Sequence, residues 1–383
     1  MKESKPLKIS VVIIIDILVF AVALLTFAYF HHVRLSFAVG ADDDGDATYG
    51  TVERPTTKPP ITTTVTDPVV DPVIVTDKDG KTVTDEDGRT VTEPVIITDT
   101  TTADDIVVPV TPTYDTSGDF GQKFGELFSA DDTVYSDEST YRSHDIYIKK
   151  EYFEGKLKQK KKPSADSASN YQVSYYLYDV YIRNVDNFIT GYSSKGVKKF
   201  ETLAGDAILS ITGDNYKNSS FPKYVIRNGN ILMDIPKTSS HDICVLYWDG
   251  VMETYQPGAY KWDDIMARGP YQVWTFGPEL IAAGGQIPTS YNTSVWTFNP
   301  RSAIGYVEPG HYIFFVADGR SNNGSAGINL SALSEIFAEH GCVSAYNLDG
   351  GASAQSVFLG EWKYHSNKYR SIYDVVSIVE VEK

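Results

Sequence analysis

The stretch Tyr346-Asn347-Leu348-Asp349-Gly350-Gly351-Ala352-Ser353 lies between two short apolar runs that are typical of buried strands, 342–345 and 356–359. Paired glycines allow positive φ and a close approach of the backbone to a ligand, and successive N–H groups in such a turn can bind an anion. Asp349 and Asn347 supply an acceptor and a donor beside it. Taken alone, the octapeptide is equally compatible with an ordinary Asp-Gly hairpin turn.

A helix is predicted directly before this stretch, over residues 329–340, where four apolar side chains fall on one helical face. These side chains are Leu330, Leu333, Ile336 and Phe337. Asn329 or Ser331 can cap the start of the helix, and Gly341 suits its C′ position. A strand ending at Asp318-Gly319-Arg320 precedes the helix. If the strands on either side of the helix are parallel, Asp318, Arg320, Asn347 and Asp349 converge on one pocket.

Five further segments, taken with the Asn347–Gly351 loop, resemble the phosphodiester glycosidase family, which includes the lysosomal uncovering enzyme and bacterial exopolysaccharide-related proteins. They occur in the family's order, and the resemblance covers roughly residues 120–383. They are Ile211–Tyr216, Tyr224–Gly229, Trp274–Pro278, Asn299–Gly305 and Val316–Arg320. The resemblance implies hydrolysis of a sugar-1-phosphodiester, such as an N-acetylglucosamine-1-phosphodiester in a cell-wall polymer or exopolysaccharide.

Such a substrate carries one negative charge, and its cleavage develops oxocarbenium-like positive charge at the anomeric carbon. A carboxylate stabilises that charge, and the catalytic candidates are Asp349, Asp318 and Asp214. Arginine forks and glycine N–H groups bind phosphate oxygens. The substrate-binding candidates are Arg301, Arg320, Asn347, Gly350, Gly351, Ser353, Gly213 and Arg370. Structural alternatives stay open: an ion pair for Arg301, turn roles for Asp349 and Asp214, and a capping hydroxyl for Ser353.

The chain departs from the family pattern in the two loops that carry most of the resemblance. Ala352 stands where glycine is usual and would be strained at positive φ, Ala354 lacks a hydroxyl, and Thr212 replaces an amide. These changes raise an alternative function, a catalytically impaired surface protein that binds a glycan or phosphoglycan. A third possibility is a wall-spacing or adhesion protein.

Composition restricts the partners and cofactors. The net charge of −16 argues against nucleic acid. Cys244 and Cys342 lie in apolar runs, which favours buried free thiols over a single disulfide bridge. The acidic residues are compatible with calcium or magnesium, but no ligand spacing requires either, so no metal is assigned and any cofactor is unknown.

The N-terminal third predicts an anchor and a stalk. In residues 1–34, three lysines precede an apolar run over 9–30, about 22 residues long, which predicts a single membrane-spanning helix with the rest of the chain outside the cell. A cleaved signal peptide is the alternative. Residues 35–118 are rich in Thr, Asp, Pro and Val, and 41–118 hold seventeen acidic residues against five basic ones, which predicts a disordered, extended stalk. Its Asp-x-Asp-Gly repeats lack a complete calcium loop.

Residues 119–383 are predicted to form one glycosidase-like domain of the α+β class, strand-rich, with a mixed sheet and few helices. Alternating side chains over 141–153 and a Tyr/Val-rich run over 171–183 predict the hairpin that opens it. Between them lies a basic run of five lysines over 156–162, which is either a solvated hairpin tip or an attractant for an anionic wall polymer.

Overall fold

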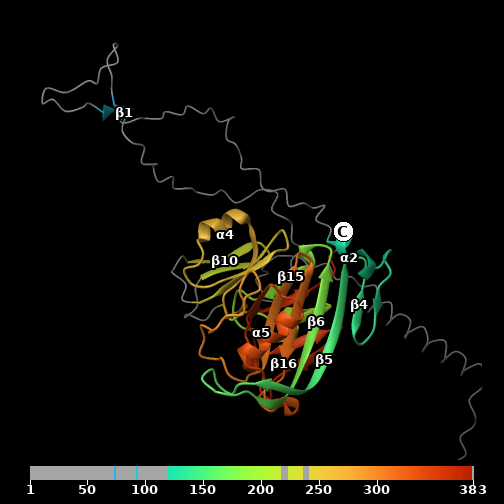
Figure 1. Ribbon diagram of the computed structural model, residues 1–383. Coiled ribbons are helices and arrows are strands. Elements are labelled where there is room, and N and C mark those ends of the chain that lie inside the picture. The colour runs from blue at the N-terminus through green and yellow to red at the C-terminus, as the bar shows by residue number, and fades with distance from the viewer. Residues whose placement is uncertain (1–72, 75–91, 94–119, 217–222, 236–240, 382–383) are drawn as a thin grey trace, which may run out of the picture. The chain divides into compact units, whose positions relative to one another are not determined.

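Two long strands, β5 (Ile146–Gln159) and β6 (Ser169–Ile182), form the predicted opening hairpin in the computed structural model (Figure 1). The structure describes residues 73–74, 92–93, 120–216, 223–235 and 241–381. Residues 120–381 belong to one compact unit and are strand-rich with few helices, as predicted. Elsewhere β1 (Val73–Ile74) and β2 (Thr92–Glu93) pair antiparallel. The predicted membrane helix lies outside the described residues, and within them no helix has the length and apolar character to span a membrane.

The β5–β6 hairpin belongs to a sheet of eight strands. Their order is β14 (Glu279–Ile281), β17 (Ser344–Asn347), β15 (Arg301–Glu308), β16 (His311–Ala317), β6, β5, β4 (Thr140–Arg142) and β3 (Tyr135–Ser136). Every strand pairing between described residues is antiparallel, so the predicted mixed sheet is wrong.

Helix α5 (Leu330–Glu339) connects β16 to β17 and confirms the predicted helix. The Asn329 side chain accepts a hydrogen bond from the Ala332 N–H at 2.8 Å, and Gly341 has φ of +78° after the last turn. β16 and β17 run in the same direction, but they are not neighbours, because β15 pairs antiparallel with both. The ends of β16 and β17 therefore lie at the same edge of the sheet, where β15 begins at Arg301.

The two faces of this sheet are covered differently. On one face, α5 buries Leu333, Ile336 and Phe337 against side chains of β6, β14, β15, β16 and β17. On the other face lies a second sheet, whose Phe188 ring is 5.2 Å from that of Phe314, and whose Phe358 ring is 5.6 Å from that of Tyr178. Its strand order is β19 (Glu361–Tyr364), β18 (Gln355–Phe358), β8 (Leu209–Thr212), β20 (Asp374–Ile378) and β7 (Phe188–Tyr192).

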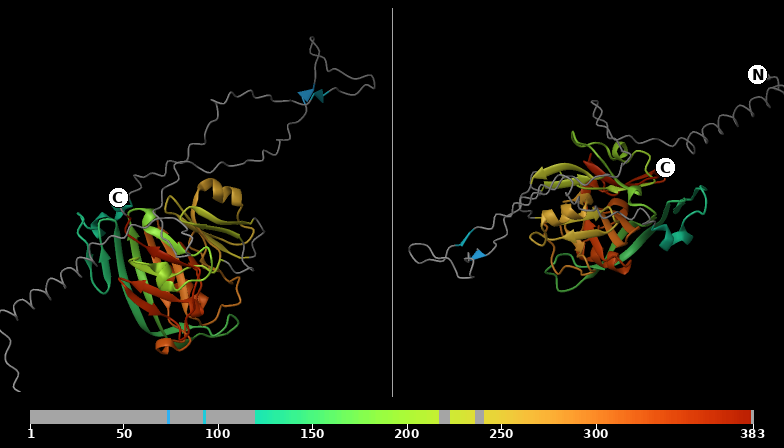
Figure 2. Two further views of the ribbon diagram at one scale, coloured as in Figure 1. Left: turned by 180° about the vertical axis from the view of Figure 1, so that it is seen from behind. Right: turned by 90° about the horizontal axis from the view of Figure 1, so that it is seen from above.

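A third sheet lies beside these two and carries α4 (Trp262–Arg268), as the views in Figure 2 show. Its strand order is β10 (Asn230–Ile235), β9 (Lys223–Arg227), β13 (Pro270–Trp274), β11 (Ile243–Tyr247) and β12 (Met252–Tyr255). The other helices in the described part of the chain are short: α2 (Gly121–Phe124), α3 (Phe200–Ala204), η1 (Gly125–Leu127), η2 (Val185–Asn187), η3 (Asn322–Gly324) and η4 (Gly351–Ser353). Cys244 and Cys342 are buried free thiols, as predicted.

Candidate active site

The turn after β17 brings three predicted residues into one cluster. The Asp349 carboxylate accepts a hydrogen bond from the Ser353 hydroxyl at 2.6 Å and from Arg370 Nη2 at 2.9 and 3.2 Å. Arg370 Nε also donates to Ser353 Oγ at 2.6 Å. The carboxylate is thus held in one orientation by two side chains, and Arg370 itself is exposed to solvent.

Asp349 is only 6% exposed, which governs its electrostatics. Burial raises the pKa of its carboxyl above the ordinary value, and the nearby Asp214 adds to this rise, while Arg370 and Ser353 oppose it. The Asp349 carboxylate is poorly solvated, and the guanidinium that compensates its charge is exposed to solvent. The pKa of such a carboxyl responds to any charge that a ligand brings close to it.

The glycine pair lets this turn pack against two other segments. A Cβ on Gly350 would lie 2.6 Å from the Pro300 carbonyl oxygen. Gly351 has φ of +62°, and a Cβ there would lie 2.8 Å from Nη2 of Arg320. Any other residue at Gly350 would push the turn away from the Pro300 backbone. At Gly351 the positive φ favours glycine, and a side chain there would displace the Arg320 guanidinium. The Gly351 N–H donates to Pro300 at 2.9 Å, so this group serves the fold.

Arg301 and Arg320 are two cations next to the glycine turn. Arg301 is buried, and its guanidinium donates to four backbone carbonyls, those of Val295, Trp296, Thr297 and Ile328, at 2.5–3.1 Å. Burial, and secondly the charge of Arg320, lower its pKa to about 9. Exposed Arg320 donates to Asn299 Oδ1 at 3.2 Å.

In the described part of the chain, neither Arg301 nor Arg320 forms an ion pair with a carboxylate. The structural alternative for Arg301, an ion pair with an acidic residue, is therefore not found among the described residues. The charge of Arg320 contributes to the lowered pKa of Arg301, and two neighbouring guanidinium groups without an acidic partner favour an anionic ligand beside them.

Asp318 lies in a neighbouring turn, but its carboxylate faces inward. The two loops do meet, because Cβ atoms on Gly319 and Gly350 would each lie 2.6 Å from backbone atoms of Pro300. The Asp318 oxygens, however, accept hydrogen bonds from four side chains: Ser174 (2.7 Å), His365 (2.9 Å), Asn322 and Asn323 (both 3.1 Å). The predicted convergence thus holds for the loops, and the carboxylates of Asp318 and Asp349 have separate sets of partners.

Asp214 is enclosed in a buried ion triad. Arg227 donates to Asp214 at 3.1 Å and, through Nε, to Asp374 at 2.8 Å, and the triad side chains are fully buried. The Asp214 N–H donates to the Asp374 carboxylate. A Cβ on Gly213 would lie 2.2 Å from that carboxylate, and the Gly213 N–H already donates to the Asp374 carbonyl at 3.1 Å. Asp214 and Gly213 are therefore placed to support the Asp349 turn from below, through a 2.8 Å bond from the Asp349 N–H to the Gly213 carbonyl.

The structure accommodates two of the departures from the family pattern, those at Ala352 and Thr212. Ala352 lies in η4 and is not among the residues with positive φ, so the expected strain is absent there. The Thr212 hydroxyl donates to the Ser353 carbonyl at 2.5 Å and accepts from the Gln355 N–H at 3.1 Å. Thr212 thereby ties β8 to the loop that carries Ser353.

Arg227, His365 and Asp374 are polar residues of this region for which the sequence predicts no catalytic or binding role. An arginine directly after the apolar pair Val225 and Ile226 was the available signal, because a charged side chain in a buried strand requires a partner. Asn347 Nδ2 donates to the Gly277 carbonyl at 2.7 Å, while its buried Oδ1 has no hydrogen-bond partner among the described residues. Such an acceptor is suited to a ligand hydroxyl.

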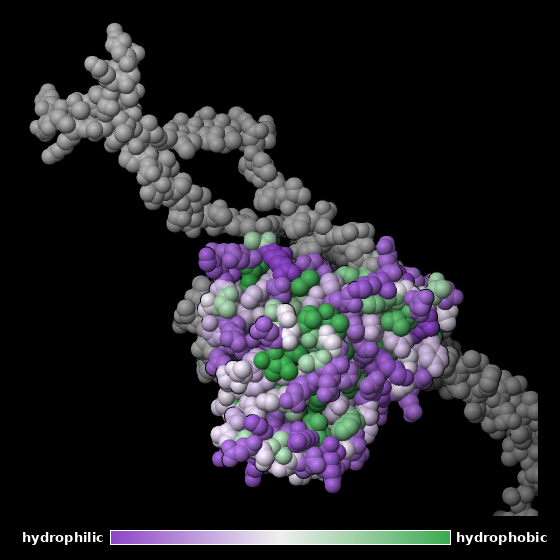
Figure 3. Space-filling view, viewed as in Figure 1, coloured by the Kyte–Doolittle hydropathy of each residue, from purple (hydrophilic) through white to green (hydrophobic). Residues whose placement is uncertain are grey.

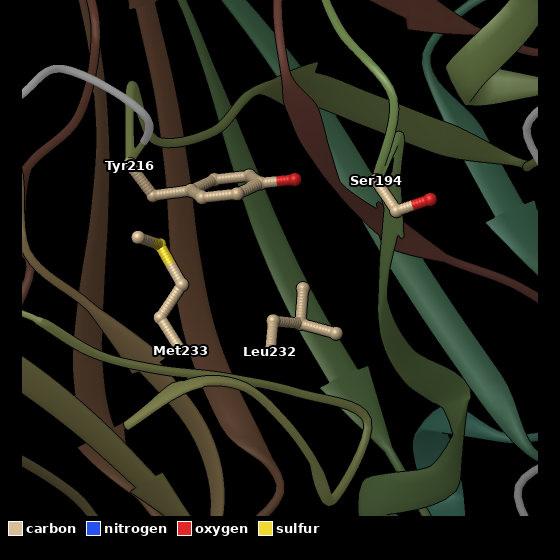
Figure 4. Close-up of a pocket in the computed structure, with 4 residues that line it drawn as sticks. All are labelled: Ser194, Tyr216, Leu232 and Met233. Carbon is tan, nitrogen blue, oxygen red and sulfur yellow. The ribbon is translucent and has the colours of Figure 1, made fainter. Parts of the chain in front are cut away.

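A cavity of about 370 Å³ lies near the buried triad, because one of its lining residues, Tyr216, packs on Arg227. Ser194 and Tyr216 lie on one side of it, and Leu232 and Met233 on the other (Figure 4). The Tyr216 ring lies 5.4 Å from the Arg227 guanidinium, and its hydroxyl donates to the Ser193 carbonyl at 2.7 Å. The cavity contains no acidic or basic lining residue among those described, so it lacks the chemistry of the Asp349 cluster. Within the described ranges no three His, Cys, Asp or Glu side chains are placed to hold a metal ion.

Comparisons with known proteins agree with the motifs. Residues 205–379 match the model of the phosphodiester glycosidase family. The SPbeta prophage-derived protein YomE of Bacillus subtilis is 30% identical over 125 residues, which cover 32% of this chain and 19% of YomE. Human N-acetylglucosamine-1-phosphodiester alpha-N-acetylglucosaminidase is 38% identical over 71 residues, 18% of this chain and 13% of the human enzyme.

Among solved structures, the catalytic domain of the zebrafish N-acetylglucosamine-1-phosphodiester alpha-N-acetylglucosaminidase aligns with a TM-score of 0.49 at 19% identity, covering 61% of this chain and 83% of that domain. The chain spans less than a fifth of the length of the curated relatives that it matches. The resemblance predicted from the motifs is confirmed over residues 205–379, which match the model of the phosphodiester glycosidase family.

Proposed function

We propose that the Asp349 cluster is the catalytic centre of a hydrolase that cleaves a sugar-1-phosphodiester. The observation that carries this proposal is a buried carboxylate held by Ser353 and Arg370, beside a glycine turn in contact with Arg320. The match of residues 205–379 to the phosphodiester glycosidase family supports the reaction class.

In this proposal Asp349 stabilises the positive charge that develops at the anomeric carbon, because its carboxylate is fixed in place and poorly solvated. Arg370 and Arg320 are exposed and receive the phosphate oxygens, while buried Arg301 adds positive potential behind them. A phosphate is a good leaving group, so the reaction requires little general-acid assistance. Asp318 and Asp214 hold the surrounding loops in position.

The proposed substrate is an N-acetylglucosamine-1-phosphodiester or a related unit of a cell-wall polymer or exopolysaccharide. Human and mouse proteins of similar sequence are named as N-acetylglucosamine-1-phosphodiester alpha-N-acetylglucosaminidases, which supports the sugar. We further propose that the protein is held in the cell membrane by residues 9–30 and that residues 119–383 face the extracellular space. The lysines before the apolar run and the acidic stalk after it support this placement.

The test is release of free sugar from a panel of sugar-1-phosphodiesters by the full chain, purified in detergent. Asp349→Asn keeps the shape of the side chain and removes its charge, so kcat/KM is expected to fall about a hundredfold or more. Asp264→Asn, an exposed acid on α4, is the matched control and should retain activity. Circular dichroism establishes that both variants are folded.

A folded wild-type chain that is inert against the whole panel contradicts the proposal. If that chain still binds a phosphoglycan, the alternative of a catalytically impaired binding protein replaces it. Restoring the family residues in the combination Thr212→Asn, Ala352→Gly and Ala354→Ser should then create activity from none.

A further inference from the structure

The tip of the β5–β6 hairpin is a strongly basic surface on an otherwise acidic chain. Five exposed lysines, Lys156, Lys158, Lys160, Lys161 and Lys162, lie within or just after the end of β5. Residues 155–171 contain a single acid, Asp166, so this segment has a net charge of +4, whereas the whole chain has −16. We call these five residues the lysine tip.

The lysine tip is fastened to the molecule through its backbone, which leaves the side chains free to face outward. Asn329 Nδ2 donates to the Lys160 carbonyl at 2.7 Å, and the Thr297 hydroxyl donates to the Lys161 carbonyl at 3.3 Å. Buried Gln159 donates to the Gly327 carbonyl at 3.0 Å and accepts from the Asn329 N–H at 3.0 Å. The tip therefore has a defined position at one end of the eight-stranded sheet.

That position is next to the candidate active site. Thr297, which contacts Lys161, also accepts a hydrogen bond from Arg301 at 2.5 Å and from Asn299 Nδ2 at 3.2 Å. Asn299 in turn accepts from Arg320, whose guanidinium lies over the Gly351 turn. Figure 1 shows the hairpin tip and the loop after β16 at the same lower end of the molecule, and Figure 3 shows hydrophilic residues at this end.

A chain of direct contacts thus links the lysine tip to Arg301, Arg320 and the glycine turn, and no carboxylate takes part in the contacts that form it. A single phosphodiester group bound at Asp349 gains little from the positive charge of the lysine tip, which lies several residues away. A polymer with one phosphate per repeat has such a use, because its flanking repeats carry further negative charges that an adjacent basic surface attracts.

We propose that the lysine tip and Arg320 form a binding track for a polyanionic polymer, namely a phosphodiester-linked glycan, whose scissile unit sits at Asp349. This inference rests on the proposed function and narrows its substrate class from sugar-1-phosphodiesters in general to polymers that carry a phosphodiester in every repeat. An anionic lipid surface is the rival partner of a lysine cluster. The polymer is favoured because the cluster is joined by direct contacts to the arginine pair.

The experiment measures binding and turnover separately. The probe is a linear polymer of N-acetylglucosamine 1-phosphate, and its binding to the full chain is followed by fluorescence anisotropy between 50 and about 300 mM salt. In the triple variant Lys160→Gln, Lys161→Gln, Lys162→Gln, the Kd at low salt is expected to rise about tenfold. The slope of log Kd against log salt should fall by about two. The polymer-to-monomer ratio of kcat/KM should fall about tenfold with it.

The matched control is Lys195→Gln, Lys199→Gln, Lys261→Gln, which removes the same charge from exposed positions outside the tip. An equal loss of polymer binding in both triple variants overturns the proposal, since net charge alone would then explain it. So does unchanged binding in the lysine-tip variant. If only binding to phosphatidylglycerol vesicles depends on the lysine tip, an anionic lipid surface replaces the polymer as the proposed partner. Tip-dependent polymer binding without any sugar release leaves this inference standing and removes the proposed hydrolase activity.

Discussion

At the scale of single residues, the two arginines beside the glycine turn, Arg301 and Arg320, have different roles. The Arg301 guanidinium satisfies four backbone carbonyls from a buried position, whereas the Arg320 guanidinium donates to Asn299 at 3.2 Å from an exposed position. Arg301→Met should lower the free energy of unfolding by about 3 kcal/mol, because it strips charged hydrogen bonds from buried acceptors. Urea unfolding measures this loss.

The comparison variants separate stability from binding. Arg301→Lys keeps the charge and some donors, so its loss should be intermediate. Arg320→Met should change stability by less than about 0.5 kcal/mol and raise KM for a phosphodiester. Equal destabilisation by Arg301→Met and Arg320→Met would show that burial and carbonyl bonding do not distinguish these residues.

Individual residues also show how much of the candidate site can be predicted from the sequence. Asp349 and Ser353 are four residues apart in one turn, so their contact follows from local geometry, and Arg370 joins them from 21 residues away. Asp318 and Asp214 are bound by partners that only the fold brings close. Ser174 is 144 residues from Asp318 in the chain, and nothing local in the sequence indicates that pairing. Carboxylates are easily found in a sequence, but their partners are not.

At the scale of elements, α5 was predictable at both ends because its signals are local: an asparagine cap at its start and a glycine after its last turn. The place of β15 was not predictable, because strand order is decided by long-range pairing. Its insertion between β16 and β17 still leaves those two strands in the same direction, which is why their loops meet as predicted.

The cap of α5 also fastens the lysine tip, which gives an element-scale prediction. Asn329 accepts from the Ala332 N–H and donates to the Lys160 carbonyl, so Asn329→Ala should cost about 2 kcal/mol of unfolding free energy, roughly half from the cap and half from the buried donor. Asn329→Ser keeps a cap acceptor and loses the amide that reaches the Lys160 carbonyl, so it should cost about half as much. Thermal or urea unfolding of the two variants checks this, and an equal loss in both would contradict a role as cap.

At the scale of the whole molecule, the Asp214–Arg227–Asp374 triad joins two sheets beneath the candidate site. Arg227 ends β9 of the third sheet, while Asp374 begins β20 and Asp214 follows β8 of the second sheet. One buried guanidinium faces two carboxylates, which leaves one negative charge uncompensated. Burial, together with the charge of Asp214 and against the attraction of Arg227, raises the pKa of Asp374 to about 7.

This shift predicts how stability depends on pH. The folded protein keeps the proton on Asp374 up to about pH 7, whereas the unfolded chain releases it near the ordinary value of 3.8. The folded state therefore binds more protons in that interval, and its stability decreases as the pH rises from about 4 to 7 by up to about 1.4 kcal/mol per pH unit from this group, with no further decrease above 7.

Asp374→Asn cannot release this proton, so it isolates the effect from every other titrating group. The difference in unfolding free energy between wild type and Asp374→Asn, measured in urea at half-unit steps from pH 5 to 8.5, should fall up to pH 7 and then stay level. Any constant offset from the weakened contact with Arg227 does not alter that slope. A difference that is independent of pH would mean that the triad holds no proton in the folded state, and that the buried junction between the two sheets carries its net negative charge throughout.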